Sequence, residues 1–243
     1  TDHDELLEMY LTAVTTGFDP HTTYMSPSTL ENFEIQMKLN LDGIGAALMS
    51  EDGYTKVTKI IPGGAADRLG KEKPKQALKV EDSIVSVGQG EDGEMVDVID
   101  MKLSDVVAMI RGKAGTVVKL GVVSPDDPKT KIYTITRAKI ELKDSEARAR
   151  VIESGKKPNG KPFKVGIIDL PSFYMDMKGA REGLADFKST TRDVRKILEE
   201  GYKTKDGEER AGFKEQSVDV VLLDLRHNGG GSTWASGRVT KFV

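Results

Sequence analysis

The sequence predicts an α+β protein with more than one domain, and three observations support this. The first 37 residues favour helix, with apolar side chains at helical spacing over residues 4–16. From Lys38 onward, short β-rich runs alternate with Gly and Asp. Beyond residue 163, two apolar runs enclose one helical segment, which is typical of an α/β unit. A chain of 243 residues is long enough for two modest domains.

Composition excludes several classes of function. Charged residues make up 31% and apolar residues 37%, as in folded globular proteins. With 36 Lys and Arg against 39 Asp and Glu, the net charge is −3 and the basic residues are scattered, so we expect no nucleic-acid partner. The absence of cysteine excludes thiolate metal sites, disulfides and a cysteine nucleophile. No apolar run reaches the ~18 residues that cross a bilayer, and no His-Glu-x-x-His spacing occurs, so we expect no membrane span and no bound metal.

We expect a helical segment over residues 1–40. Its first helix ends at the turn-rich stretch "GFDPHTTYMSP", and a second helix is predicted over residues 27–37. The chain opens on this amphipathic helix rather than on a signal peptide, so we expect any export signal to lie upstream. The apolar face of the first helix consists of Leu6, Leu7, Tyr10, Leu11 and Val14.

The middle of the chain is predicted to be mainly β-structure, with one helix at "MKLSDVVAMIRG". Residues 139–162 are charged and irregular, and we expect a connector with room for one strand. A buried strand over 164–170, a helix over 190–200 and a second buried strand over 218–226 follow. Three consecutive glycines, residues 229–231, follow two residues after the last strand.

The stretch "LDGIGAAL", residues 41–48, has two interpretations. Glycines at this place let successive backbone N–H groups point at one anion, so Gly43, Ile44, Gly45 and Ala46 are predicted to hold a peptide carboxylate. The strand that follows would pair with the peptide, and a nearby helix would contact its last side chain. The alternative is a tight turn in an ordinary β-barrel, and these eight residues alone favour it.

Longer motifs favour the first interpretation. The segments "IIPGGAADRLG", "LKVEDSIVSVGQG" and "LSDVVAMIRGKAGTVVKLGVV" follow in order. Residues 41–138 thereby resemble a PDZ domain of the bacterial type, which implies a PDZ-like β-barrel with helices. By this analogy Ala47 and Leu48 on the strand, with Val106 and Ile110 on the helix, line an aliphatic peptide groove. The sequence departs from the family pattern at Glu81-Asp82, where Gly-Asp is usual.

The flanking motifs "FDPHTTYMSP", "VGIIDLPSFY" and "LLDLRHNGGGS" narrow the resemblance. Together with the middle segment, they resemble the carboxy-terminal processing (tail-specific) serine proteases over nearly the whole chain. The resemblance implies that residues 139–243 form the first, incomplete part of an α/β, crotonase-like protease core. It also implies recognition of the C-terminal tails of substrate proteins, a Ser–Lys dyad, no cofactor, and a location in the bacterial periplasm or cell envelope. The oligomeric state is not predicted.

The resemblance assigns a role to the glycine-rich turn. In the family, backbone N–H groups of this turn stabilise the oxyanion, so Gly229 and Gly230 are predicted donors. The nucleophile lies in a Ser-Ala-Ser-type motif well beyond the glycines, and the base lies further still. Lys241 comes too early to be that base, so the dyad is expected beyond Val243 and the 243 residues alone are expected to be inactive.

The remaining polar residues are predicted to have structural roles. Ser232 is expected to be a helix N-cap. Asp224 and Arg226 are expected to brace the glycine turn, and His227 to be structural. His3 lies at the terminus, and His21 is expected to cap or pack in the "DPHTTY" turn.

Two other functions remain open at this stage. A PDZ adaptor without any dyad would carry the same middle segment. A crotonase-like acyl-CoA enzyme also uses backbone N–H groups as an oxyanion hole, although an inserted PDZ domain does not fit it.

Overall fold

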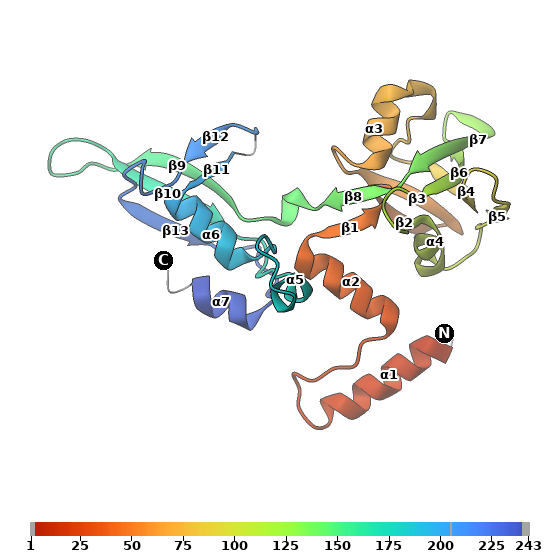
Figure 1. The fold of residues 1–243 in the computed structure, drawn as a ribbon, viewed down its shortest axis with the longest axis horizontal. Coiled ribbons are helices and arrows are strands. Elements are labelled where there is room, and N and C mark those ends of the chain that lie inside the picture. Colours follow the sequence, from red (N-terminus) through yellow and green to blue (C-terminus); the bar gives the residue numbers. More distant parts are fainter. Residues whose placement is uncertain (1–2, 205, 240–243) are drawn as a thin grey trace. The chain divides into compact units, whose positions relative to one another are not determined.

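The computed structural model describes residues 3–204 and 206–239, and it divides the chain into two compact units (Figure 1). Unit 1 combines Thr1–Leu39 with Leu142–Val243, and unit 2 is Asn40–Glu141. The sequence boundaries at 40/41 and 138/139 lie close to these limits. The N-terminal helical segment, however, belongs to the same unit as the residues that follow the PDZ-like segment.

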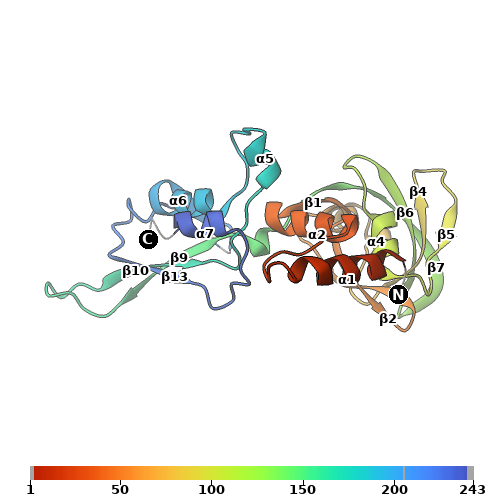
Figure 2. The same ribbon diagram turned by 90° about the horizontal axis from the view of Figure 1, so that it is seen from below.

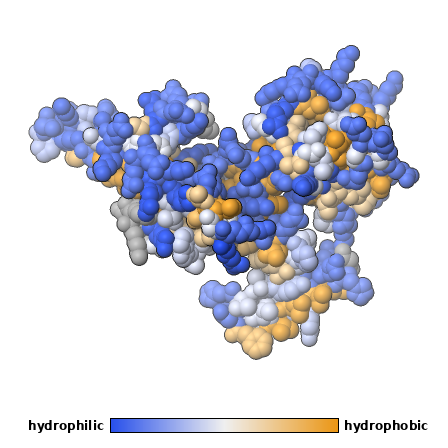
Figure 3. Space-filling model, in the orientation of Figure 1, coloured by the Kyte–Doolittle hydropathy of each residue, from blue (hydrophilic) through white to orange (hydrophobic). Residues whose placement is uncertain are grey.

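Two helices begin unit 1, as the sequence predicts: α1 (His3–Thr16) and α2 (Pro27–Lys38). The Ser26 side chain caps α2 by accepting the Thr29 N–H, and Pro27 occupies the first turn, where no helical donor is lost. α2 ends at Lys38 and is followed by the C-cap residue Leu39, whose φ of 52° is left-handed. α1 has no buried residue and exposes its apolar side chains, part of which Figure 3 shows. They are Leu6, Leu7, Met9, Tyr10 and Val14.

The core of unit 1 is a three-stranded sheet of order β13-β10-β9, with β9 (Arg148–Ser154), β10 (Phe163–Asp169) and β13 (Val220–Asp224). β10 pairs parallel with β13 and antiparallel with β9. The predicted strands at 164–170 and 218–226 are therefore confirmed within a few residues. β9 lies within the charged connector predicted over residues 139–162, where the sequence left room for one strand.

Helices cover one face of this sheet (Figure 2). They are α6 (Thr190–Glu199) and α7 (Thr233–Val239). Val194 and Ile197 of α6 pack with Ile168 of β10 and with Phe213 in one buried cluster. The unit is completed by η2 (Lys143–Ser145), α5 (Met177–Arg181) and the hairpin of β11 (Gly201–Lys203) with β12 (Glu209–Ala211).

Unit 2 is entered and left through an antiparallel pair, β1 (Asn40–Gly43) with β8 (Ala138–Glu141). Between them lie β2 (Ala46–Glu51), β3 (Tyr54–Ile60), α3 (Ala65–Glu72), η1 (Pro74–Gln76), β4 (Ser83–Gln89), β5 (Met95–Asp97), α4 (Leu103–Ile110), β6 (Val117–Ser124) and β7 (Asp127–Thr136). Their buried apolar residues form one cluster that includes Val57, Ile84, Val87 and Leu120.

The sheet of unit 2 is open. Its strands follow the order β2-β3-β4-β6-β7, with β5 on β4. β2 and β7 lie at the two ends and do not pair with each other among residues 40–141, all of which are described. The mixed helix-and-strand class is confirmed, and the strands of the PDZ-like segment form an open sheet rather than a closed barrel.

Candidate functional site

The predicted carboxylate turn lies between β1 and β2. Gly43, Ile44 and Gly45 are buried, and Gly45 has a left-handed φ of 79°. Their carbonyls anchor the turn, because Ile44 O accepts the Ala66 N–H at 2.8 Å and Gly45 O accepts the Ile61 N–H at 2.8 Å. Outside the strand ladders, the N–H groups of Ile44 and Gly45 have no acceptor among the described residues.

Glycine is required at position 45 by a close approach of two backbones. A Cβ on Gly45 would lie 3.0 Å from Gly64 Cα and 3.2 Å from Ile140 Cδ1. Gly64 is the N-cap of α3, so the turn rests against the start of that helix. The turn is therefore held against the start of α3 by backbone contacts, and Ile44 also packs in the same buried cluster as Val106 and Ile110 of α4.

The four predicted groove residues do not share one environment. On β2, Ala47 is exposed and Leu48 is half-buried. On α4, Val106 and Ile110 belong to the core of unit 2 with 0% and 3% exposure, so in this structure they do not face a peptide. Leu103 and Val107 are half-buried on the same helix and lie outside that core cluster, which fits a one-position shift of the predicted face. α4 contacts β2, whose other edge has no paired strand among the described residues.

The second candidate site is the glycine turn after β13. Gly229 N–H donates to Pro171 O at 3.3 Å, and Gly230 N–H donates to Asn228 Oδ1 at 2.8 Å. Both predicted oxyanion donors are thus occupied by acceptors within the chain. The carbonyl of Gly230 in turn accepts the Phe173 N–H at 2.8 Å.

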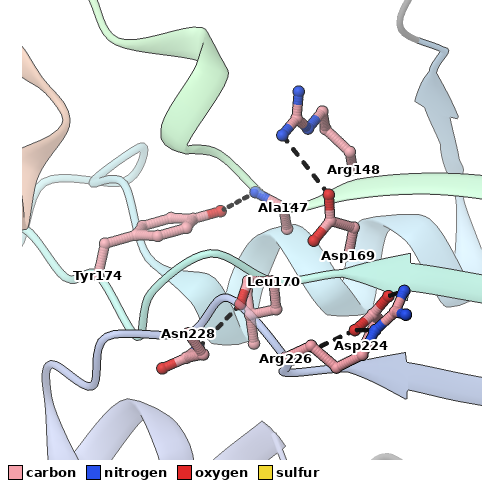
Figure 4. Close-up of polar contacts among 8 residues, drawn as sticks. All are labelled: Ala147, Arg148, Asp169, Leu170, Tyr174, Asp224, Arg226 and Asn228. Carbon is pink, nitrogen blue, oxygen red and sulfur yellow. Dashed lines mark hydrogen bonds and ion pairs between the residues drawn. The ribbon is translucent and has the colours of Figure 1, made fainter.

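Asn228 fixes this turn, a role that the sequence did not reveal. Its side-chain Nδ2 donates to the carbonyl of buried Leu170 at 2.8 Å (Figure 4). Its Oδ1 accepts the Gly230 N–H. Asp224 and Arg226, which we expected to brace the turn, instead bond to each other through Nε–Oδ1 and Nη2–Oδ2 contacts of 2.9 and 2.6 Å. Hydrogen bonds from the Arg226 side chain and backbone hold the pKa of Asp224 well below its usual range.

A polar network supports the segment opposite the glycine turn. Tyr174 is fully buried, and its hydroxyl donates to Asp193 at 2.6 Å. The same hydroxyl accepts the Ala147 N–H at 3.1 Å (Figure 4). Burial, with the Asp193 charge, raises the pKa of Tyr174 far above its usual value. Lys188 pairs with Glu146 at 3.1 Å and with Asp193 at 3.2 Å. Burial opposes the charge of Lys188, but the two carboxylates outweigh it and raise its pKa.

The other polar residues considered in the sequence analysis lie outside the two candidate sites or have local structural contacts. Ser232 Oγ accepts the Ala235 N–H at 3.3 Å, which confirms the N-cap of α7. His21 Nδ1 lies 3.1 Å from Asp19 Oδ1 in an exposed turn, and His227 is exposed. His3 begins α1, and Lys241 lies outside the described residues.

The described residues offer neither a metal cluster nor a membrane-spanning helix. Residues 3–204 and 206–239 contain no group of three or more His, Asp or Glu side chains that could hold a metal ion. Within the same ranges, no helix is both long and apolar enough to cross a membrane.

Comparison with known proteins gives relatives over almost the whole chain. A family model described as the tail specific protease N-terminal domain matches residues 1–28. The tail-specific protease of Haemophilus influenzae is 32% identical over 232 residues, which cover 96% of this chain and 28% of the relative. The carboxy-terminal processing protease CtpA of Bacillus subtilis is 26% identical, covering 94% of this chain and 50% of the relative. The chain thus spans half or less of the length of these two relatives.

A solved PDZ domain is similar in sequence to part of this chain. The PDZ domain of a carboxy-terminal protease from Vibrio cholerae, crystallised in complex with a peptide, is 42% identical. The match covers 43% of this chain and 100% of that domain, with a TM-score of 0.38.

Proposed function

We propose that the chain, which is similar over almost its whole length to tail-specific and carboxy-terminal processing proteases, is part of a serine endopeptidase that selects protein substrates by their free C-termini. The observation that supports this most directly is the 32% identity to a tail-specific protease over 96% of the chain. Each unit has its own role in this proposal. Unit 2 binds the C-terminal tail of the substrate, and unit 1 contributes to the catalytic core.

The geometry of unit 2 supports capture of a peptide C-terminus. The backbone N–H groups around Gly43–Ala46 bind the terminal carboxylate, because a turn of this kind concentrates donors on one anion. The open edge of β2 then pairs with the extended peptide. Leu103 and Val107 of α4 contact the last side chain, which favours peptides with a small or apolar C-terminal residue.

For the whole protein, the proposed reaction is hydrolysis of a peptide bond. Gly229 and Gly230 donate their N–H groups to the developing oxyanion, an interaction worth about 3–4 kcal/mol of barrier in such sites. Since both groups have internal acceptors here, the scissile carbonyl has to displace Asn228 Oδ1 and Pro171 O. The nucleophilic serine and the basic lysine belong to a part of the protein that these 243 residues do not span.

The proposal extends to the activity and cofactors of the chain and to the location of the whole protein. It binds protein tails without hydrolysing them. It requires no metal or organic cofactor and no nucleic acid. The whole protein acts in the bacterial periplasm or cell envelope, where tail-bearing substrates are exported.

The proposal is tested by titrating the chain with a fluorescent peptide that ends in Leu-Ala-Ala, as the free acid and as the C-terminal amide. We expect the acid to bind with micromolar affinity. The affinity for the amide should be lower by about tenfold or more, because the amide loses charge-assisted hydrogen bonds. Equal binding of acid and amide would overturn carboxylate recognition. Turnover of the peptide by the pure chain would overturn the assignment of the dyad to another part.

A matched pair of variants on α4 locates the peptide. Val107→Asp introduces a charge at a half-buried position outside the core, whereas Ala108→Asp introduces the same charge at an exposed position of the same helix. We expect only Val107→Asp to weaken binding of the Leu-Ala-Ala acid. Equal effects of the two variants would exclude this face of α4 as the contact surface.

A further inference from the structure

Arg137 is a buried arginine between β7 and β8, with 4% of its surface exposed. Its guanidinium donates five hydrogen bonds. Nε donates to Ile110 O at 2.8 Å, and Nη2 donates to Met109 O at 2.9 Å. Nη2 also donates to Gln89 Oε1 at 2.7 Å, and Nη1 donates to Thr116 Oγ1 and to the carbonyl that follows it, at 3.0 and 3.1 Å.

Two of these acceptors are at the C-terminal end of α4. Met109 and Ile110 are the last two residues of the helix, and their carbonyls have no partner within it. A cation at this end also interacts favourably with the helix dipole. Gln89 Nε2 donates to the same Met109 carbonyl at 2.7 Å, so Arg137 and Gln89 together attach the end of α4 to the sheet.

Gly112 leaves the space that the guanidinium occupies. A Cβ at this position would lie 3.0 Å from Arg137 Nε, 3.1 Å from Cζ and 3.2 Å from Cδ. The φ of Gly112 is 154°, a conformation that side chains rarely adopt. The chain after α4 is therefore shaped to let the arginine reach beneath the helix end.

The charge of Arg137 is not balanced by an acid. All five of its acceptors are neutral oxygens, and no carboxylate accepts from it among the described residues of unit 2. Burial lowers the pKa of this guanidinium. A buried cation without a counter-ion is costly, and a side chain that only filled space would not need the charge.

We propose that Arg137 is a positioning residue that sets where α4 lies beside β2, and thereby determines which C-terminal side chain the protein accepts. The inference rests on the proposed peptide-binding function. α4 contacts both β2 and β4, and its C-terminal end is attached by Arg137. The carboxylate turn is instead anchored by backbone bonds from Ile61 and Ala66. Loss of Arg137 should therefore change selectivity for the last side chain and leave recognition of the carboxylate intact.

The test measures two ratios with the 243-residue chain. The first is the affinity for a peptide ending in Leu-Ala-Ala over the same peptide ending in Leu-Ala-Asp. The second is the affinity for the Leu-Ala-Ala acid over its amide. The variants are Arg137→Gln and Gln89→Ala, which alter the two side chains that hold the end of α4, here called the clamp. Lys113→Gln is the control, because Lys113 is exposed and its replacement removes a positive charge near α4 without altering either clamp side chain.

We expect Arg137→Gln to reduce the first ratio about tenfold, since it replaces charge-assisted hydrogen bonds to the helix end, and to leave the second ratio unchanged. Gln89→Ala should reduce the first ratio less, and Lys113→Gln should leave both ratios unchanged. Circular dichroism shows whether Arg137→Gln folds. If it does not, Gln89→Ala, at an exposed residue, tests whether the attachment of α4 affects the first ratio.

The outcomes separate this inference from the function on which it rests. Absence of acid preference in the unsubstituted chain would overturn the proposed function. The unsubstituted chain could prefer the acid while Arg137→Gln and Gln89→Ala leave the first ratio unchanged. That result would overturn only the role of Arg137. Parallel loss of both ratios would show that Arg137 maintains the whole unit rather than the position of α4.

Discussion

Asn228 and Leu170 join the ends of two neighbouring parallel strands: the Asn228 side chain donates to the Leu170 carbonyl at 2.8 Å. Leu170 follows β10 directly, and Asn228 lies four residues after the end of β13. The Gly230 N–H returns to the same Asn228 side chain at 2.8 Å. One amide thus determines both where the glycine turn lies and which way one of its N–H groups points.

Removing this amide should destabilise unit 1. Asn228→Ala loses two hydrogen bonds and leaves the carbonyl of buried Leu170 without its partner, so we expect a loss of about 1–3 kcal/mol in the free energy of unfolding. Urea denaturation measures it. His227→Ala is the control, because its side chain is exposed next to the turn. Equal stability of Asn228→Ala and His227→Ala would contradict the bracing role.

The Tyr174 hydroxyl should matter for the same unit through a different network. Tyr174→Phe keeps the buried ring but leaves the Ala147 N–H without its acceptor and takes a donor from Asp193. We expect a loss of about 1–3 kcal/mol in unfolding free energy, measured by chemical denaturation. Tyr10→Phe removes a hydroxyl from an exposed residue of α1 and should change nothing. A stable Tyr174→Phe variant would mean that a rearranged neighbour satisfies both groups.

Lys188 should make unit 1 lose stability at high pH. Its pKa in the folded state is raised, because Asp193 and Glu146 outweigh the effect of burial. The pKa in the unfolded state is about 10.4. Protonated Lys188 therefore stabilises the fold fully below about pH 10, and this contribution is lost as the pH rises through the folded-state value.

The difference in unfolding free energy between the unsubstituted chain and Lys188→Met isolates this effect. It should be constant between neutral pH and about pH 9 and should shrink above about pH 10.4. A difference that grows with pH in that range would contradict the sign of the shift.

Fold elements that are determined by contacts between residues close in the sequence could be predicted, and those that depend on distant contacts could not. The helix at 190–200 was predictable because its apolar residues repeat at helical spacing, and α6 indeed buries Val194 and Ile197. The family resemblance was likewise predictable from motifs in order, and the relatives confirm it. The one strand for which the 139–162 connector left room could not be placed from the sequence, because "RARVIES" of β9 alternates weakly and is stabilised by pairing with β10 along its whole length.

The site residues were harder to predict because their environment depends on distant contacts. Val106 and Val107 are adjacent and identical, yet the first is buried in the core and the second is half-buried outside it, a difference of helix phase that spacing alone did not resolve. Asn228 and Arg137 bond to residues 58 and 27 positions away, respectively. No short-range pattern reports such partners, so both roles became visible only in three dimensions.

The close approach at Gly45 gives a prediction with a matched control. Gly45 and Gly63 have nearly the same left-handed φ, 79° and 75°. A Cβ on Gly45 would lie 3.0 Å from Gly64 Cα, whereas a Cβ on Gly63 would have nothing within 4 Å. Gly63→Ala should therefore cost only the intrinsic penalty of a left-handed alanine, about 1–2 kcal/mol, and Gly45→Ala should cost clearly more.

Binding should separate these two variants even more strongly than stability does. Gly45→Ala has to push the turn away from α3, which moves the N–H groups proposed to bind the carboxylate, so the preference for a peptide acid over its amide should fall towards one. Gly63→Ala should keep that preference. Thermal unfolding and the acid–amide titration measure the two effects on the same samples. An unchanged acid preference in folded Gly45→Ala would mean that the carboxylate is bound elsewhere in unit 2.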